Sequence, residues 1–176
     1  MSFINALALV LCVIGGILTY LALGPAANFF FIWAIFIATA TGVALGGSIE
    51  SFKNLVICGI AGVVIAWVAS LVILSTVASV GLPLPVYAGI IVGLTTGCLA
   101  LIANIPAFPA IPATVVGYAM TFAYLLQTPG KLDLKVLLSA TLSNPLICIS
   151  LSILVAAAFG IVALNLAGKL STVKTA

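Results

Sequence analysis

The chain has 176 residues, of which 65% are hydrophobic and only 4% are charged, with no histidine. A soluble domain carries about a quarter charged residues, so this composition indicates an integral membrane protein with the lipid bilayer as its main partner. Five basic and two acidic residues give a net charge of +3. That is too few basic residues for the dense basic face that nucleic-acid binding needs.

Hydrophobic runs broken by Gly, Pro, Asn and charged residues predict six membrane-spanning helices. No charged residue lies between Asn54 and Gly130, whereas one span needs only about 20 apolar residues. Helices are expected because a bilayer offers no hydrogen bonds to the backbone. The predicted fold is an all-α polytopic transmembrane helix bundle, a single integral membrane domain over 1–176 with spans near 3–23, 29–45, 54–76, 85–103, 112–126 and 145–167.

The lysines favour one topology. With six spans, both termini share a side with Lys53, Lys169 and Lys174, while Lys131 and Lys135 lie opposite. Cytoplasmic loops carry the excess of lysine and arginine. We therefore expect a multi-pass protein of the bacterial inner (plasma) membrane with cytoplasmic termini.

Small residues recur every fourth position in two of the predicted spans. They are Ala38, Gly42 and Gly46 in the second span and Gly89, Gly93 and Gly97 in the fourth. Such spacing lets helix backbones approach closely. The contact is expected either inside one protomer or between subunits, and a small bundle of this kind favours a homo-oligomer.

A short internal similarity accompanies these stripes. Residues 38–42 (ATATG) resemble residues 93–97 (GLTTG), 55 positions later. One interpretation is a duplication that relates the second and fourth spans, and the other is chance.

A proline-rich segment follows the fourth span. Pro106, Pro109 and Pro112 recur every third residue, and proline disfavours helix at and just before its position. Residues 104–111 are therefore expected to be extended or sharply turned. Two interpretations stay open: a tight connection at the membrane surface, or a re-entrant piece that is buried or lines a wet cavity.

The last hydrophobic run, 136–168, is too long for one simple span. Its 33 residues would make a helix of about 50 Å, against a hydrocarbon core of about 30 Å. Asn144 suits an N-cap and Pro145 the first helical position. Either a short interfacial helix reaches Ser143 and the span starts at Pro145, or a discontinuous helix faces a permeation path.

Few side chains offer chemistry. The only acids, Glu50 and Asp133, fall in predicted loops, and Glu50 is three residues from Lys53, as expected of a solvated pair at the interface. The four cysteines form no CxxC pair. We expect no enzyme activity, no metal site and no cofactor, because nucleophile–base pairs and ligand clusters are missing.

Neutral polar residues remain inside the predicted spans. A hydroxyl can bond its own helix, or several together can line a narrow path whose bore aromatic rings set. The pore-lining candidates are Thr39, Thr41, Thr95, Thr96, Phe108, Thr114, Thr121, Phe122, Ser143 and Asn144.

Three segments carry a family resemblance that covers nearly the whole chain. They run from Trp33 to Gly47, from Pro112 to Ala123, and from Leu132 to Lys135. Together they resemble bacterial inner-membrane proteins of the domain-of-unknown-function family 1097. The resemblance implies a polytopic inner-membrane protein of about this length and no established activity. The proline-rich approach to a Thr-bearing helix, with Asn144-Pro145-Leu146, carries a looser likeness to urea-channel proteins.

The leading functional hypothesis is a channel or facilitator for a small neutral solute, such as urea or a short amide. It depends on the uncharged interior, the hydroxyl groups and the two proline-broken segments. A non-transporting membrane subunit or scaffold is one alternative. The other is a gradient-coupled transporter of a small organic ion that uses helix dipoles.

Overall fold

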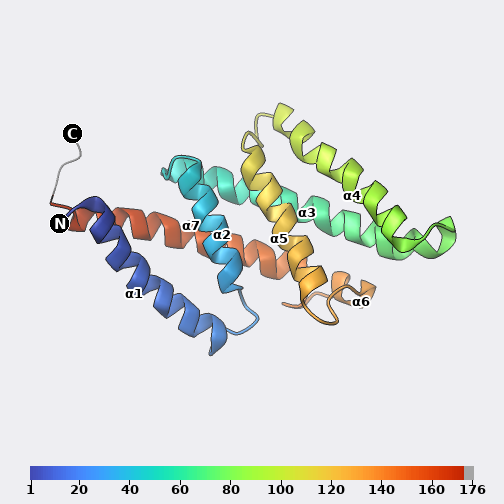
Figure 1. The fold of residues 1–176 in the computed structure, drawn as a ribbon, viewed down its shortest axis with the longest axis horizontal. Coiled ribbons are helices and arrows are strands. Elements are labelled where there is room, and N and C mark those ends of the chain that lie inside the picture. Colours follow the sequence, from blue (N-terminus) through green and yellow to red (C-terminus); the bar gives the residue numbers. More distant parts are fainter. Residues whose placement is uncertain (173–176) are drawn as a thin grey trace.

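The computed structural model describes residues 1–172, and over these residues it contains helices and no strand (Figure 1). The elements are α1 (Phe3–Leu23), α2 (Ile32–Ala44), α3 (Ile49–Val80), α4 (Leu84–Leu101), η1 (Ile102–Asn104, a 3₁₀ helix), α5 (Ile111–Gln127), α6 (Leu134–Leu137) and α7 (Pro145–Leu170). The prediction of an all-α helix bundle is confirmed. Lys174, which entered the predicted topology, lies outside the described residues.

Four of these helices are long and apolar enough to cross a membrane: α1, α3, α4 with η1, and α7. The other two predicted spans are shorter apolar helices, with 13 residues in α2 and 17 in α5. At 1.5 Å per residue, α2 is about 20 Å long, less than the ~30 Å hydrocarbon core. By length and composition, residues 1–172 therefore contain four candidate spans and two shorter apolar helices.

The helices form two similar groups of three. The long helices α3 and α7 pack side by side at the middle of the molecule and run in opposite directions, with α2 packed across α7 and α5 packed across α3 (Figure 1). At the two ends, α1 packs on α7 and α4 packs on α3. A half-turn about the viewing axis of Figure 1 exchanges α1 with α4, α2 with α5 and α3 with α7. We call α1–α2–α3 the first unit and α4–α5–α7 the second unit.

This arrangement differs from the duplication predicted from residues 38–42 and 93–97. Those segments lie on α2 and α4, but the half-turn relates α2 to α5. The 55-residue similarity therefore does not describe the symmetry of the fold. Short strings of Ala, Thr and Gly recur wherever helices pack closely. The similarity therefore indicates close helix packing and is not evidence of a sequence repeat.

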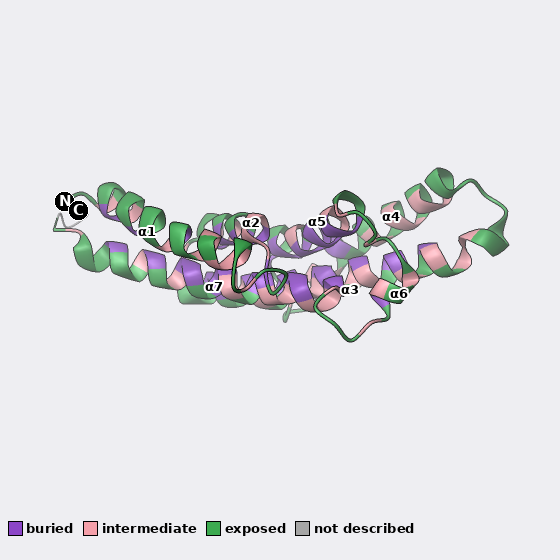
Figure 2. Ribbon diagram, turned by 90° about the horizontal axis from the view of Figure 1, so that it is seen from below, coloured by how far each residue is buried: buried purple, intermediate pink, exposed green. Residues whose placement is uncertain are grey.

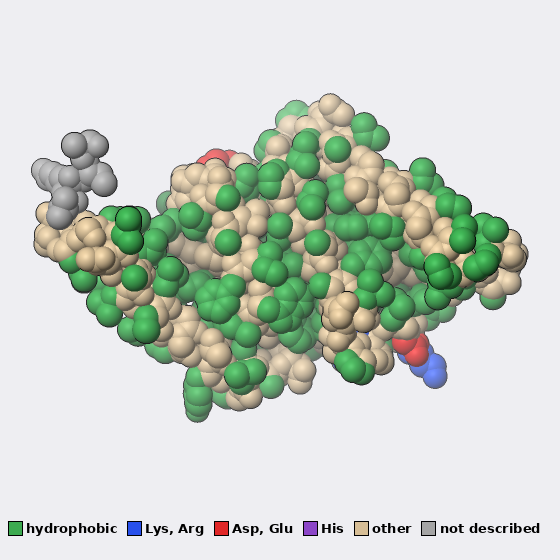
Figure 3. Space-filling model, viewed as in Figure 1, with side chains coloured by type: hydrophobic (Ala, Val, Ile, Leu, Met, Phe, Trp, Pro, Cys, Tyr) green, Lys and Arg blue, Asp and Glu red, His purple; other side chains and the backbone are tan. Residues whose placement is uncertain are grey.

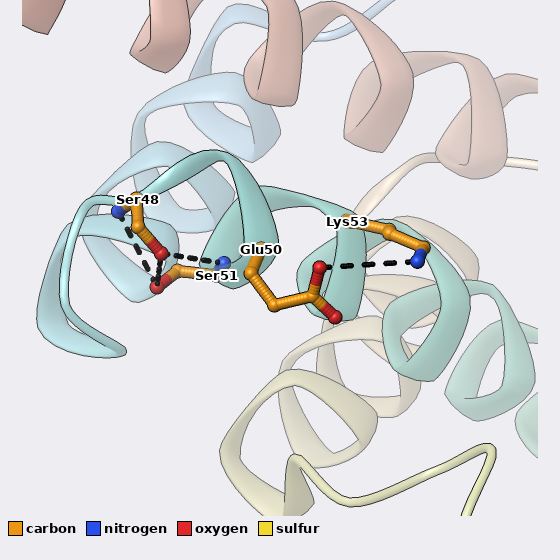
Figure 4. Close-up of polar contacts among 4 residues, drawn as sticks. All are labelled: Ser48, Glu50, Ser51 and Lys53. Carbon is orange, nitrogen blue, oxygen red and sulfur yellow. Dashed lines mark hydrogen bonds and ion pairs between the residues drawn. The ribbon is translucent and has the colours of Figure 1, made fainter.

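Helix α3 begins earlier than predicted, at Ile49 rather than Asn54. Ser48 accepts a hydrogen bond from the Ser51 backbone N–H (3.1 Å), and the Ser51 side chain accepts one from the Ser48 N–H (3.4 Å; Figure 4). This reciprocal cap starts the helix before the apolar run. Glu50 and Lys53 thus lie on the exposed first turn of a helix and not in a loop.

The core lies where α2, α3, α5 and α7 meet, and burial is concentrated there (Figure 2). Phe52 of α3 is fully buried against Gly42 of α2 and Gly160 of α7. A Cβ atom at either glycine would lie within 2.3 Å of the Phe52 ring. The two glycines therefore make the space that this ring fills.

The outer surface is largely hydrophobic. On the face in Figure 3, acidic and basic side chains show only at its upper and lower edges. Large hydrophobic side chains are exposed on long and short helices alike, for example Tyr20 and Leu23 on α1, Leu94 on α4 and Leu126 on α5. Such a surface is compatible with hydrocarbon surroundings rather than with water.

Both proline-broken segments are present. Residues 105–110 form no helix, and α5 starts at Ile111 with Pro112 in its first turn. Before α7, the short helix α6 ends at Leu137, so the predicted interfacial helix up to Ser143 is shorter than expected. Asn144 caps α7 and Pro145 opens it, so α7 itself is continuous to Leu170.

Candidate functional site

The densest set of polar contacts surrounds residues 137–144, from the last residue of α6 to the N-cap of α7, which we call the α6–α7 segment. Asn144 is its anchor: the side-chain N–H₂ donates to the carbonyl oxygens of Leu137 and Ser139 (2.8 Å each), and its oxygen accepts from the Leu146 N–H (3.0 Å). One buried side chain thereby satisfies two carbonyl groups and one helical N–H. The predicted N-cap is confirmed, and it also folds the segment back on itself.

Three other elements hold the same segment. Trp67 of α3 donates its indole N–H to the Leu137 carbonyl (2.9 Å), and Tyr124 of α5 donates its hydroxyl to the Ser143 carbonyl (2.9 Å). The Lys131 ammonium donates to the Ser143 hydroxyl (3.0 Å) and lies 5.9 Å from the centre of the Tyr124 ring, within range of a cation–π contact. The segment is therefore tied to α3 and α5 as well as to α7.

The predicted pore-lining hydroxyls do not converge on one path in the structure. Thr114 and Thr121 are buried and bond their own helix at Ala110 and Gly117 (3.3 and 2.9 Å). Thr41 and Thr96 do the same on the outer side of their helices (3.0 and 2.7 Å). Thr39 instead reaches another helix, donating to the Ala156 carbonyl of α7 at 3.1 Å.

Two other candidates, Thr95 and Phe122, both contact Tyr118, which was not among the predicted pore-lining residues. The Thr95 and Tyr118 hydroxyls are hydrogen-bonded at 2.8 Å, linking α4 to α5, and the Tyr118 ring lies 4.9 Å from that of Phe122. Phe108 is half-buried against the main core. The pairing of Thr95 with Tyr118 was not predicted, because nothing in a single sequence states which helices are neighbours.

The two small-residue stripes have different surroundings. In α2, Ala38 is fully buried and Gly42 contacts Phe52, whereas Gly46 lies beyond the helix in a turn with φ = 118°. In α4, a Cβ atom added at Gly89, Gly93 or Gly97 would have no neighbour within 4 Å. The α4 stripe thus faces outward, so packing inside the protomer does not explain it.

Two cavities lie on opposite sides of the contact between α3 and α7. Cavity 1, of about 410 Å³, lies among α3, α4 and α5, and cavity 2, of about 420 Å³, lies among α1, α2 and α7. Both are lined by apolar side chains apart from a few hydroxyls. Those hydroxyls are already bonded: Ser70 and Tyr118 in cavity 1 to Ala66 and Thr95, and Thr39 in cavity 2 to Ala156.

Buried polar atoms are satisfied throughout the described residues. Every buried side-chain nitrogen or oxygen among them has a hydrogen-bond partner. Within residues 1–172, no three histidine, cysteine, aspartate or glutamate side chains gather closely enough to hold a metal ion. Cys58 and Cys148 are buried free thiols. The interior therefore presents neutral, bonded groups and apolar walls.

The fold and these sites define a class: a helical bundle with the length and composition of an integral membrane protein. Its interior among the described residues is uncharged. The chain belongs to the family described as "Protein of unknown function (DUF1097)", whose model matches residues 8–168. The predicted family membership is thereby confirmed. The searches of curated proteins and of solved structures found no match.

Proposed function

We propose that this protein is a facilitator for a small neutral solute, such as urea or a short amide, in the bacterial inner membrane. The observation that carries the proposal is the half-turn between the first and second units. Helices α1 and α4 start at opposite ends of the molecule, and α3 and α7 run in opposite directions (Figure 1). Three-helix units arranged in this inverted way are a common plan of membrane transporters.

The interior supports a neutral cargo. The buried polar side chains of the described residues are all uncharged: Thr39, Ser51, Ser70, Thr114, Thr121, Asn144 and Ser152. An ion would need compensating charge or free helix dipoles in such a place. The Thr95–Tyr118 pair, in which Tyr118 is buried and Thr95 half-buried, and the α6–α7 segment provide hydroxyl and carbonyl oxygens that can accept hydrogen bonds from a small amide.

The direct test is stopped-flow light scattering of proteoliposomes challenged with urea, acetamide or glycerol, with empty liposomes as the control. We expect faster swelling for one or two of these solutes. The acceleration should be the same at pH 6 and pH 8, because the chain has no histidine and Glu50, the one acid within the described helices, lies exposed at the start of α3. Equal rates with and without protein for all three solutes would exclude this cargo class.

A matched pair of variants locates the path. Thr95→Val removes the hydroxyl that bonds Tyr118 and leaves the shape nearly unchanged, and we expect it to alter the solute flux. Thr41→Val removes a hydroxyl that bonds only its own helix, so its flux should equal that of the wild type. Equal flux for both variants would place the path away from Thr95.

The second candidate is a membrane subunit or scaffold. The outward glycine face of α4 favours it, since Gly89, Gly93 and Gly97 have no neighbours in the protomer. A homo-oligomer would bury this face. Gly93→Leu should then lower the oligomer mass measured by light scattering in detergent, while solute flux stays at the empty-liposome level in every variant. Uptake that requires a sodium or proton gradient would instead identify a coupled transporter.

A further inference from the structure

The half-turn that relates the two units also relates their residue numbers: equivalent helices correspond at a constant offset in the sequence. Residues 54–58 of α3 (NLVIC) and 144–148 of α7 (NPLIC) share Asn, Ile and Cys at an offset of 90. Adding 90 to a buried α3 position gives a buried α7 position in nine of eleven cases, from Leu55 and Pro145 to Ile73 and Ala163. The two exceptions, Ser51 and Phe52, correspond to the irregular α6–α7 segment.

The short helices follow a register of their own. Helices α2 and α5 begin at Ile32 and Ile111, an offset of 79, and all five buried positions of α2 fall on buried positions of α5 at that offset. Helices α1 and α4 begin at Phe3 and Leu84, an offset of 81. The two units therefore correspond residue by residue, although most side chains differ.

At these offsets, residues that line cavity 1 correspond to residues that line cavity 2. On the long helices, Ser70, Ile73 and Leu74 of cavity 1 correspond to Gly160, Ala163 and Leu164 of cavity 2. Adding 90 converts each of the first three into its counterpart.

The other walls agree as well. Tyr118, Ala119 and Phe122 of cavity 1 correspond to Thr39, Ala40 and Val43 of cavity 2 at the offset of 79. Ala88 and Val92 correspond to Leu7 and Leu11 at the offset of 81. Eight of the eleven lining positions of each cavity thus have a counterpart in the other, and the volumes are nearly equal.

The chemistry of both cavities selects an apolar occupant. Their lining hydroxyls already donate their hydrogens within the protein, so no free donor is left for a polar ligand, and the rest of the lining is apolar. Their rims consist of exposed apolar side chains, among them Leu84 and Leu126 at cavity 1 and Phe36 and Val43 at cavity 2. In a bilayer such rims face lipid chains, which are present at far higher concentration than any other apolar molecule.

We infer that the chain is an inverted duplication whose two equivalent cavities each hold one acyl chain of a membrane lipid. Cavity 1 lies beside the start of α4 and cavity 2 beside the start of α1. Because these helices start at opposite ends of the molecule, the two lipids belong to opposite leaflets. The inference does not depend on which solute, if any, crosses the membrane.

The test is native mass spectrometry of the whole protein, released from micelles titrated with dioleoylphosphatidylcholine. The wild type should retain two lipids per chain above the statistical background. Ala119→Phe fills cavity 1 and Ala40→Phe fills cavity 2, at corresponding positions. Each variant should retain one lipid and the double variant none.

Matched controls exclude a general effect of added bulk. Ala8→Phe on α1 and Ala100→Phe on α4 also enlarge exposed alanines, but neither residue lines a cavity. Both should retain two lipids. A wild type with no lipid above background, or equal numbers in cavity and control variants, would overturn the inference. If a Phe variant is not monodisperse, Ala→Leu at the same position replaces it and must also lower the count.

Discussion

The contact between α3 and α5 and the contact between α2 and α7 occupy corresponding places in the two units, yet they are built differently. In the first, Gly117 lies against the backbone of Gly59: a Cβ atom on Gly117 would be 1.9 Å from the Gly59 carbonyl oxygen. In the second, the position that corresponds to Gly117 is Ala38, and Thr39 next to it bonds the Ala156 carbonyl.

The difference shows two solutions to one packing problem. Without a hydrophobic driving force between helices in lipid, association depends on close van der Waals packing and on interhelical hydrogen bonds. The α3–α5 contact uses backbone against backbone, and the α2–α7 contact uses a hydroxyl together with the Phe52 ring between Gly42 and Gly160. A duplicated fold can therefore keep its topology while each copy stabilises it with different residues.

The largest effect is expected from closing the glycine contact. Gly117→Val would force α3 and α5 apart, and we expect a loss of upward of about 3 kcal/mol in unfolding free energy, at or beyond the usual range for overpacking. Denaturation by SDS in mixed micelles, followed by tryptophan fluorescence, measures it. The control is Gly93→Val, at an open position of α4, with little change. Equal losses of unfolding free energy in the two variants would show that α3 and α5 are not closely packed at Gly117.

The next effect tests the other contact. Phe52→Ala removes the ring that fills the space between α2 and α7, leaving a cavity, and should cost about 3 kcal/mol, the low end for such a truncation. The same denaturation assay applies. Phe29→Ala, at a half-exposed ring, is the control and should cost much less. A loss below that of the control would mean that the two glycines, not the ring, determine this contact.

The starts of α3 and α7 provide a smaller contrast. Asn144→Ala breaks two bonds to buried carbonyls and one cap, and we expect a loss of about 2 kcal/mol. Ser48→Ala removes the N-cap side chain of α3 and should cost about 1 kcal/mol. Thermal unfolding in detergent ranks the two. The reverse order would indicate that the α6–α7 segment contributes little to stability.

The smallest effect is expected at the surface of α3. Glu50 and Lys53 lie 3.8 Å apart, and their side chains are 69% and 63% exposed. Exposed pairs contribute about 0–1 kcal/mol, so Lys53→Ala should leave the midpoint of unfolding unchanged within error, at both low and high salt. A salt-dependent shift would show that this end of α3 depends on the ion pair.

The sequence was sufficient for the features that depend on local chemistry. Its lack of charge defined the membrane class, its long apolar runs predicted the helices, and α1 spans the predicted residues 3–23. Asn144-Pro145 identified the start of α7, because a side-chain acceptor and a fixed φ act on adjacent residues. The small-residue and aromatic patterns also identified the family.

Only the tertiary structure decided which parts face one another. The threonines predicted to line one path bond separate helices, the α4 glycines face outward, and the two units correspond at offsets of 79, 81 and 90 rather than 55. Hydrophobic periodicity could not show which helices are neighbours, because the sequence of a helix that is apolar on all sides does not distinguish its buried face from its lipid-facing one. In a membrane protein the buried face is determined by close packing and hydrogen bonds with the neighbouring helices.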